Sequence, residues 1–111
     1  MRAQDKELAR TDVELTAGRG RANLRIETEA QATGLVIESR RAVGVRYRQG
    51  GQDKVARCRA EVLLSAGAIQ SPQLLQLSGI GPASLLTQRG VDVVHDLKGV
   101  GENLQDHLQI R

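Results

Sequence analysis

Residues 67–81 of this chain read GAIQSPQLLQLSGIG, and they follow the apolar run VLLSA at residues 62–66. The apolar run is continuous rather than alternating, which predicts a β-strand that is covered on both faces, as in a parallel sheet. Gly67 allows a tight turn after this strand, because glycine lacks the Cβ that restricts other residues. A tight glycine between a buried strand and a helix is how doubly wound folds bring backbone N–H groups close to a cofactor.

The rest of this stretch predicts a helix with a defined start and end. Ser71 is expected to be the N-cap and Pro72 the first helical residue, where the missing N–H of proline costs nothing. Gly79 is expected to end the helix. Residues 82–89 predict a second short helix, and residues 91–94 predict a final strand. Together with the strand before Gly67, these elements indicate an α/β fold.

The residues before this stretch predict a small antiparallel β-meander. Residues 23–28 alternate apolar and polar side chains, which is typical of a half-buried strand. Residues 35–37 and 43–47 predict two strands joined by a short polar connection. The Gly50-Gly51 pair marks the next turn, and residues 54–59 predict another strand.

Composition limits the classes of function. A chain of 111 residues is enough for one small domain. Its net charge of +3 could suit nucleic acid, but the arginines are scattered among acidic residues. Tyr47 is the only aromatic residue, so no series of rings is available to stack on bases. We therefore expect a mixed-charge surface and no nucleic-acid partner. No apolar stretch approaches the roughly 20 residues of a membrane span, so none is expected.

The titratable residues predict neither a metal site nor a catalytic centre. Cys58 is the only cysteine, which excludes a disulfide within the chain and fits a cytoplasmic location. His95 precedes Asp96 and His107 follows Asp106, and neighbours in sequence rarely face each other as an acid–base pair. No catalytic residue and no metal ligand is therefore predicted.

The same stretch carries a family resemblance. Small residues at 67–68, Ser-Pro at 71–72, Leu-Leu at 74–75 and SGIG at 78–81 have the spacing of the second signature of the glucose–methanol–choline (GMC) oxidoreductases. Residues 21–28, 41–47 and 97–107 resemble the segments that flank this signature. The resemblance covers roughly residues 21–111. Within the family it is closest to the branch of choline dehydrogenases and related alcohol dehydrogenases.

The resemblance implies a fold and a cofactor. Residues 21–111 would be part of an FAD/NAD(P)-binding, Rossmann-like domain with an antiparallel β-meander, and residues 1–20 a poorly ordered N-terminal segment. Ala32 stands where the family often has a valine whose backbone contacts the adenine of FAD. Ala66 and Gly67 fall where the family's chain passes close to the cofactor. Residues 103–107 lie, in relatives, near the flavin.

The resemblance also implies a reaction for the longer parent protein. There, a histidine would abstract the proton of an alcohol hydroxyl while hydride passes to FAD. The family's G-x-G-x-x-G loop and its catalytic histidine pair are not found among these residues. We therefore expect a partial FAD-dependent alcohol oxidoreductase, an internal piece of a chain about five times longer, whose partners are FAD, an alcohol substrate and a complementing polypeptide. The alternatives are a non-catalytic binding or interaction module and a non-functional gene fragment.

Overall fold

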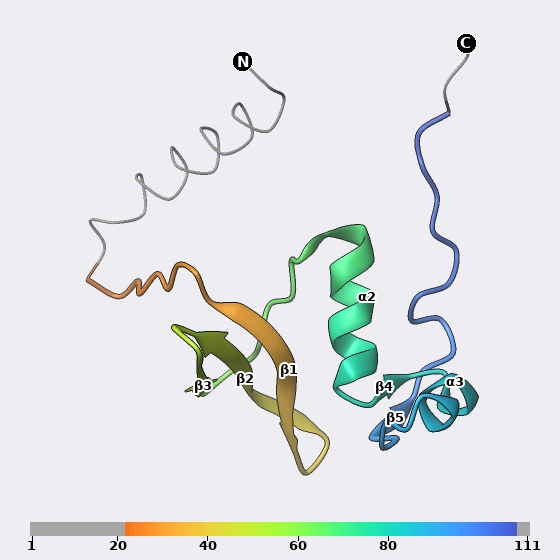
Figure 1. The fold of residues 1–111 in the computed structure, drawn as a ribbon, viewed down its shortest axis with the longest axis horizontal. Coiled ribbons are helices and arrows are strands. Elements are labelled where there is room, and N and C mark those ends of the chain that lie inside the picture. Colours follow the sequence, from red (N-terminus) through yellow and green to blue (C-terminus); the bar gives the residue numbers. More distant parts are fainter. Residues whose placement is uncertain (1–21, 109–111) are drawn as a thin grey trace.

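The first half of the molecule is a three-stranded antiparallel sheet (Figure 1). The structure, a computed structural model, describes residues 22–108. The sheet has the strand order β1-β2-β3. Its strands are β1 (Gln31–Glu38), β2 (Arg41–Gln49) and β3 (Gln52–Arg57). The expected poorly ordered segment, residues 1–20, lies outside the described residues.

The meander predicted from sequence is confirmed for these three strands. The first turn places Ser39 at φ 50° and Arg40 at φ 63°, and the second places Gly50 at φ 58° and Gly51 at φ 76°. Two successive residues with positive φ are the signature of the turns whose twist matches that of a hairpin. Each turn therefore sets the register of its own pair of strands.

The strand predicted at residues 23–28 is not formed, which corrects that prediction. The chain is irregular from residue 24 to residue 28, and Leu24 remains 47% exposed. Glu29 follows with φ 52°, a conformation that interrupts an extended strand. No described strand pairs with these residues, so alternation alone did not supply a hydrogen-bonding partner.

The second half of the molecule consists of two helices and a very small parallel sheet. Helix α2 (Gly67–Leu77) stands beside β1, and α3 (Ala83–Gln88) lies near the end of α2 (Figure 1). Strand β4 (Ile80–Gly81) pairs in parallel with β5 (His95–Asp96). The second predicted helix, residues 82–89, is thereby confirmed as α3.

Helix α2 begins earlier than predicted. Its N-cap is Ala66, so Ser71 and Pro72 lie inside the helix rather than at its start. The Ser71 hydroxyl still stabilises the start of α2, because its Oγ accepts a hydrogen bond of 2.9 Å from the N–H of Ala66. Pro72 lacks the N–H that would bond to the carbonyl of Ala68 within the helix. The start was mispredicted because proline was assumed to occupy the first turn.

Gly79 ends α2 as predicted and also allows a close chain crossing. It has φ +81°, and a Cβ at this position would lie 2.4 Å from the carbonyl oxygen of Asp92. The Gly79 carbonyl accepts hydrogen bonds from the N–H groups of Val94 and His95. These bonds place the strand pairing at β5, so the strand predicted at residues 91–94 is wrong by a few residues.

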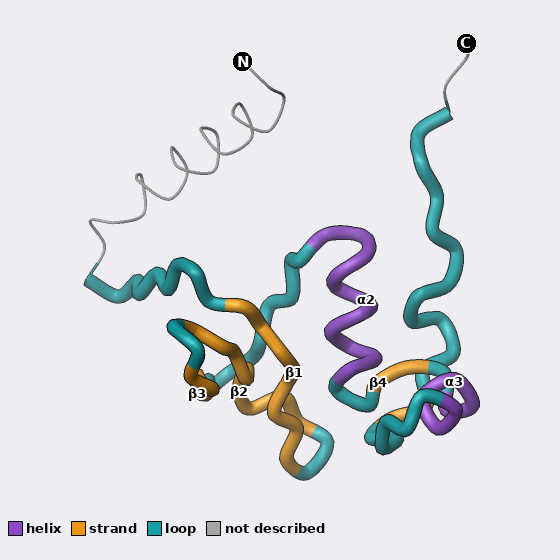
Figure 2. The backbone as a smooth tube through the Cα atoms, viewed as in Figure 1, coloured by secondary structure: helices purple, strands orange, loops and turns teal. Residues whose placement is uncertain are grey.

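The apolar run at residues 62–66 does not form the predicted buried strand. It belongs to the loop that leads from β3 to α2 (Figure 2), and Leu63 is 81% exposed. A two-sided strand needs a neighbour along each backbone edge and cover on each face. Among residues 22–108 no strand pairs with this run by backbone hydrogen bonds, so it does not become part of a sheet.

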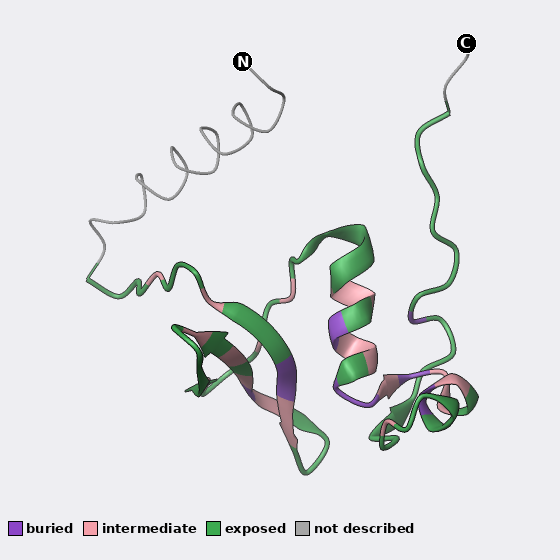
Figure 3. Cartoon of the chain, viewed as in Figure 1, coloured by how far each residue is buried: buried purple, intermediate pink, exposed green. Residues whose placement is uncertain are grey.

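The buried core is small and lies where α2 meets its neighbours. Figure 3 shows the buried positions concentrated on β1, on α2 and around the α2–β4 connection. The buried apolar side chains are Leu35, Leu74, Leu86 and Val100. Leu86 of α3 is the most deeply buried of them at 2% exposure. The core therefore joins the meander to the helices through only a few side chains.

Candidate functional site

A hollow of about 410 Å³ lies between the first residues of β1 and one side of α2. We call it the β1–α2 hollow. The residues that define it are Ala30, Gln31 and Ala32 on the strand side and Ala66, Gln70, Gln73, Leu74 and Leu77 on the helix side. Every residue that lines this hollow is uncharged. Its volume is within the roughly 300–1,000 Å³ of small-molecule sites.

The strand wall of the hollow offers free backbone groups. Strand β1 is at the edge of its sheet, so only one of its two backbone edges pairs with β2. The register shifts between Ala32 and Gly34, which leaves Thr33 as an extra residue in a β-bulge. A bulge turns the local backbone and interrupts the ladder. The peptide groups around Ala32 are therefore placed where a ligand could bond to them.

The helix wall of the hollow begins at the tight turn after residue 65. Gly67 has φ +88°, a conformation that side chains rarely adopt, and a Cβ there would meet no atom within 4 Å. The first turn of α2 contains no acidic residue, and no side chain caps it. The first N–H groups of the helix therefore have neither a side-chain cap nor a nearby acidic residue of the first turn, and they carry the partial positive charge of a helix N-terminus.

These two walls bring sequence-predicted residues together. Ala32 and Ala66 are far apart in sequence, yet both line the β1–α2 hollow, and Gly67 follows Ala66 directly. Contact of these three residues with a cofactor stays a prediction. Sequence reasoning did not single out the two amide side chains of the helix wall, Gln70 and Gln73. Their spacing of three residues on one helix, which places them on the same side, was the available signal.

A buried hydroxyl connects β1 to α2. Ser78 is 7% exposed, and its Oγ accepts a hydrogen bond of 2.8 Å from the N–H of Leu35 in β1. The same hydroxyl donates a hydrogen bond of 2.6 Å to the carbonyl of Leu74 in α2. Sequence reasoning noted Ser78 within the SGIG part of the family signature and missed this link, because its strand partner lies far away in sequence.

A second groove, of about 780 Å³, runs between α2 and the segment that follows Val100. Gln76 attaches this segment to the helix, because its Nε2 donates a hydrogen bond of 3.1 Å to the Val100 carbonyl. Asn103, in the segment expected near a flavin, lines this groove with a positive φ of 57°. Helix α2 therefore has a hollow on one side and a groove on another.

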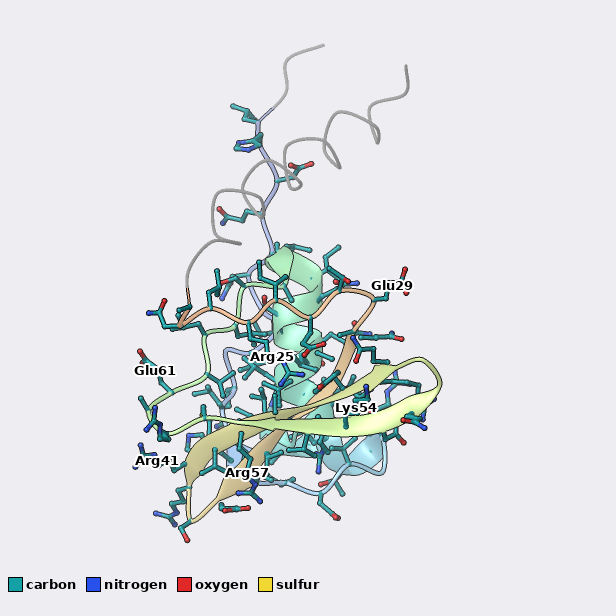
Figure 4. The ribbon with its side chains drawn as sticks, turned by 90° about the vertical axis from the view of Figure 1, so that its left-hand side faces the viewer. Arg25, Glu29, Arg41, Lys54, Arg57 and Glu61 are labelled. Carbon is teal, nitrogen blue, oxygen red and sulfur yellow. The ribbon has the colours of Figure 1, made fainter. Side chains whose placement is uncertain are left out.

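The charged residues of the meander lie on its solvent-facing surface. Figure 4 shows Arg41 on β2 and Lys54 and Arg57 on β3. The hydrogen bond from Arg57 and its positive charge lower the pKa of Glu38 below the usual glutamate range. Arg48 lowers the pKa of Asp53 in the same way. The first pair joins β1 to β3 and the second joins β2 to β3, both at the surface. Neither pair contributes a charge to the lining of the hollow.

The histidines take no part in the β1–α2 hollow. His95 lies in β5, where it pairs with Ile80, and the N–H of His107 donates to Oδ1 of its neighbour Asp106. Among residues 22–108, no three His, Cys, Asp or Glu side chains gather closely enough to hold a metal ion. Within this part of the chain, no helix combines the length and the apolar character that crossing a membrane requires.

The family model described as GMC oxidoreductase matches residues 4–109. The chain belongs to the GMC oxidoreductase family. The resemblance noted in the sequence is therefore confirmed, and the match begins nearer the N-terminus than residue 21. The fold class is confirmed as well, since the meander and helices correspond to a fragment of the Rossmann-like domain of solved relatives.

The chain is similar to curated members of this family. It is 56% identical over 96 residues to the oxygen-dependent choline dehydrogenase of Chromohalobacter salexigens, covering 86% of this chain and 17% of that protein. It is 55% identical over 98 residues to the enzyme of the same name from Serratia proteamaculans, covering 86% of this chain and 18% of that protein. The chain thus spans about a sixth of the length of these relatives.

Solved structures of the family share this fold. An FAD-dependent oxidoreductase from Chaetomium thermophilum matches with a TM-score of 0.77 at 36% identity, over 82% of this chain and 16% of that chain. Pyridoxine 4-oxidase from Mesorbium loti matches with a TM-score of 0.76 at 37% identity, over 82% of this chain and 18% of that chain. The arrangement of meander and α2 therefore occurs within larger family members.

Proposed function

We propose that this chain forms the part of an FAD-dependent alcohol oxidoreductase that holds the adenine end of FAD. The observation that carries the proposal is the β1–α2 hollow, where Ala32 and Ala66 meet. Membership of the GMC family, whose solved relatives include a protein named as FAD-dependent, supports FAD as the ligand. The names of the curated relatives support an alcohol such as choline as the substrate of the whole protein.

The hollow suits a flat, uncharged heterocycle such as adenine. Leu74 and Leu77 supply apolar surface for the faces of the ring, and Gln70 and Gln73 supply amide donors and acceptors. The backbone at Ala32, on an unpaired strand edge, offers an N–H and a carbonyl to the polar edge of the ring. The family's usual valine would present the same backbone groups, so alanine at this position fits.

The start of α2 suits the phosphates that follow the adenosine in FAD. Free N–H groups at a helix N-terminus favour anions. Gly67 leaves space beside them, since a Cβ there would meet no neighbouring atom. Ala66, whose own N–H is engaged by Ser71, holds the turn in place.

In this proposal the chain's residues bind and orient the cofactor and carry out no chemical step. When bound, FAD supplies the chemistry of accepting a hydride from the carbon that bears the hydroxyl. Ala32, Ala66 and Gly67 are assigned to cofactor binding. A histidine base, a complementing polypeptide and a cytoplasmic location remain parts of the proposal that rest on the family resemblance and the composition.

The proposal is tested by titrating the purified chain with FAD and with ADP, following binding by calorimetry. We expect saturable binding of both, since the hollow addresses the adenine half that they share. Gly67→Ala should weaken binding by roughly tenfold, equivalent to about 1.4 kcal/mol. Gly90→Ala is the matched control, because Gly90 also has a positive φ and open space around it, but Gly67 directly follows Ala66 of the hollow and Gly90 has no neighbour in sequence that lines it.

A second variant pair tests the apolar wall. Leu77 is 54% exposed and lines the hollow, whereas Leu97 is 45% exposed and does not line it. Leu77→Ala should weaken ADP binding several-fold, and Leu97→Ala should leave it unchanged. Equal effects of the two substitutions, or no binding of either nucleotide by a folded chain, would contradict the proposal. The latter result would favour the non-catalytic or non-functional alternatives.

A further inference from the structure

Ser78 occupies an unusual position for a polar side chain. Among residues 22–108, Ser78 is the only polar residue that is buried. Its hydroxyl forms hydrogen bonds both to a helix and to a strand. The bond to the Leu74 carbonyl, four residues earlier, is a common local arrangement of serine in helices. The bond from the Leu35 N–H crosses 43 positions of sequence and reaches another layer of the fold.

The two partners of Ser78 lie on the strand and the helix between which the β1–α2 hollow opens. Leu74 lines the hollow directly, and Leu35 follows the β-bulge that begins at Ala32. Because β1 is an edge strand, its pairing with β2 does not set its distance from α2. The Leu35–Ser78 hydrogen bond holds the unpaired edge of the strand against the end of the helix.

Gly34 lies beside this hydrogen bond. A Cβ at Gly34 would lie 3.6 Å from the Ser78 hydroxyl oxygen, an ordinary van der Waals contact, and 3.1 Å from a guanidinium nitrogen of Arg46. A side chain longer than a methyl group would therefore compete for the space between the strand and the serine.

We propose that Ser78 is a positioning residue for the nucleotide: its hydroxyl sets the separation of β1 from α2, and thereby places the Ala32 backbone opposite the helix wall of the hollow. This inference rests on the proposed function, because it names a residue that prepares that same site. Ser78 does not line the hollow and acts only through Leu35 and Leu74.

The test compares Ser78→Ala and Ser78→Thr with the unchanged chain, using ADP as the probe. Removal of the hydroxyl should weaken ADP binding by roughly fivefold to tenfold, the range expected when one buried hydrogen bond of about 1 kcal/mol is lost. Ser78→Thr keeps the hydroxyl and should restore affinity to within roughly threefold of the unchanged chain. Affinities are measured at a temperature where circular dichroism shows each variant to be folded.

A matched control separates positioning from general stability. Asp96→Ala also removes a side-chain hydrogen bond to a backbone N–H, that of Ala83 at 2.9 Å, but Asp96 does not line the hollow. It should lower the melting temperature without changing ADP affinity. If Ser78→Ala and Asp96→Ala change affinity equally, or if Ser78→Thr fails to restore it in a folded chain, the inference is overturned.

A second readout tests the inference without a ligand, so its outcome is separate from that of the proposed function. Ser78→Ala should speed hydrogen exchange at the Leu35 amide and weaken the nuclear Overhauser contacts between β1 and α2, while exchange within the β2–β3 pair stays unchanged. If the unchanged chain binds no ADP, the proposed function fails, and this readout alone decides the inference. Unchanged exchange at Leu35 and unchanged contacts would overturn it.

Discussion

The β-meander and the apolar run at residues 62–66 reached opposite outcomes, although both were predicted as strands. The meander formed because each hairpin contains its own turn and both of the strands that the turn joins. The apolar run has strong strand-forming residues but stays irregular, and Leu63 is 81% exposed. The difference shows that a strand is determined by available partners and not by its side chains alone.

The largest expected effect on stability comes from comparing a leucine in the meander with a leucine in the apolar run. Leu35 in the meander is 6% exposed and Leu63 in the run is 81% exposed. Leu35→Ala should lower the free energy of unfolding by about 2–5 kcal/mol, because it leaves a cavity in the core. Leu63→Ala should change it by less than about 0.5 kcal/mol. Urea unfolding measures both, and similar losses would show that the run is packed in solution.

The second prediction concerns the close contact of β2 with β3. A Cβ at Gly44 would lie 2.5 Å from the Ala56 carbonyl oxygen, whereas a Cβ at Gly99 would meet nothing within 4 Å. Gly44→Ala should cost about 1–3 kcal/mol of unfolding free energy through overpacking. Gly99→Ala should be close to neutral. Denaturant unfolding compares the two, and a neutral Gly44→Ala would mean that the sheet is looser than the structure indicates.

A smaller effect is expected from the ion pair that joins β1 and β3. Arg57 lowers the pKa of Glu38, so the pair stabilises the fold above the ordinary glutamate pKa of about 4.3. This contribution is lost as pH falls through the lower pKa of the folded state. Glu38→Gln should therefore reduce stability slightly at pH 7 and not at pH 2, with the difference shrinking at high salt.

The control for this pair is Glu61→Gln. Glu61, labelled in Figure 4, forms no ion pair with any described residue. Its substitution should leave the pH dependence of unfolding unchanged. Identical pH profiles for the two variants would show that the Glu38–Arg57 pair contributes nothing measurable.

The smallest effect on stability is expected from a charge placed in the apolar run. Leu63→Lys should change the unfolding free energy by less than about 0.5 kcal/mol, because the side chain already faces solvent. It should reduce self-association, since exposed apolar segments promote it. Light scattering at rising concentration measures this effect. Stronger association of the variant would contradict the described exposure of Leu63.

Much of the fold was predictable because its signals are local. The turns at Ser39-Arg40 and Gly50-Gly51, the end of α2 at Gly79 and the helix at residues 82–89 depend on residues adjacent in sequence. The wrong predictions concern segments whose structure depends on pairing with a distant part of the chain. Residues 23–28 have no pairing strand, and the pairing of β5 is fixed by the carbonyl of Gly79 rather than by its own side chains.

The residues of the candidate site also fall into two groups, those that the sequence indicated and those that it did not. The family resemblance indicated Ala32, Ala66 and Gly67, and the structure places the first two around one hollow. Gln70, Gln73 and Ser78 were not indicated. Their place in the site depends on how β1 packs against α2, and this packing brings together segments that are distant in sequence.

The sequence by itself determined the family, the meander, the presence of both helices and the end of α2, because spacing of small, apolar and turn-forming residues acts over short distances. Only the tertiary structure decided that β1 stands against α2 and that a hollow opens between them. The physical reason is packing between distant segments: Leu35 of β1 and Leu74 of α2 are both buried in the core, and the Ser78 hydroxyl bonds to Leu35 across 43 positions. A hydrogen bond of this kind leaves no periodic pattern in sequence, because it depends on two segments meeting in space.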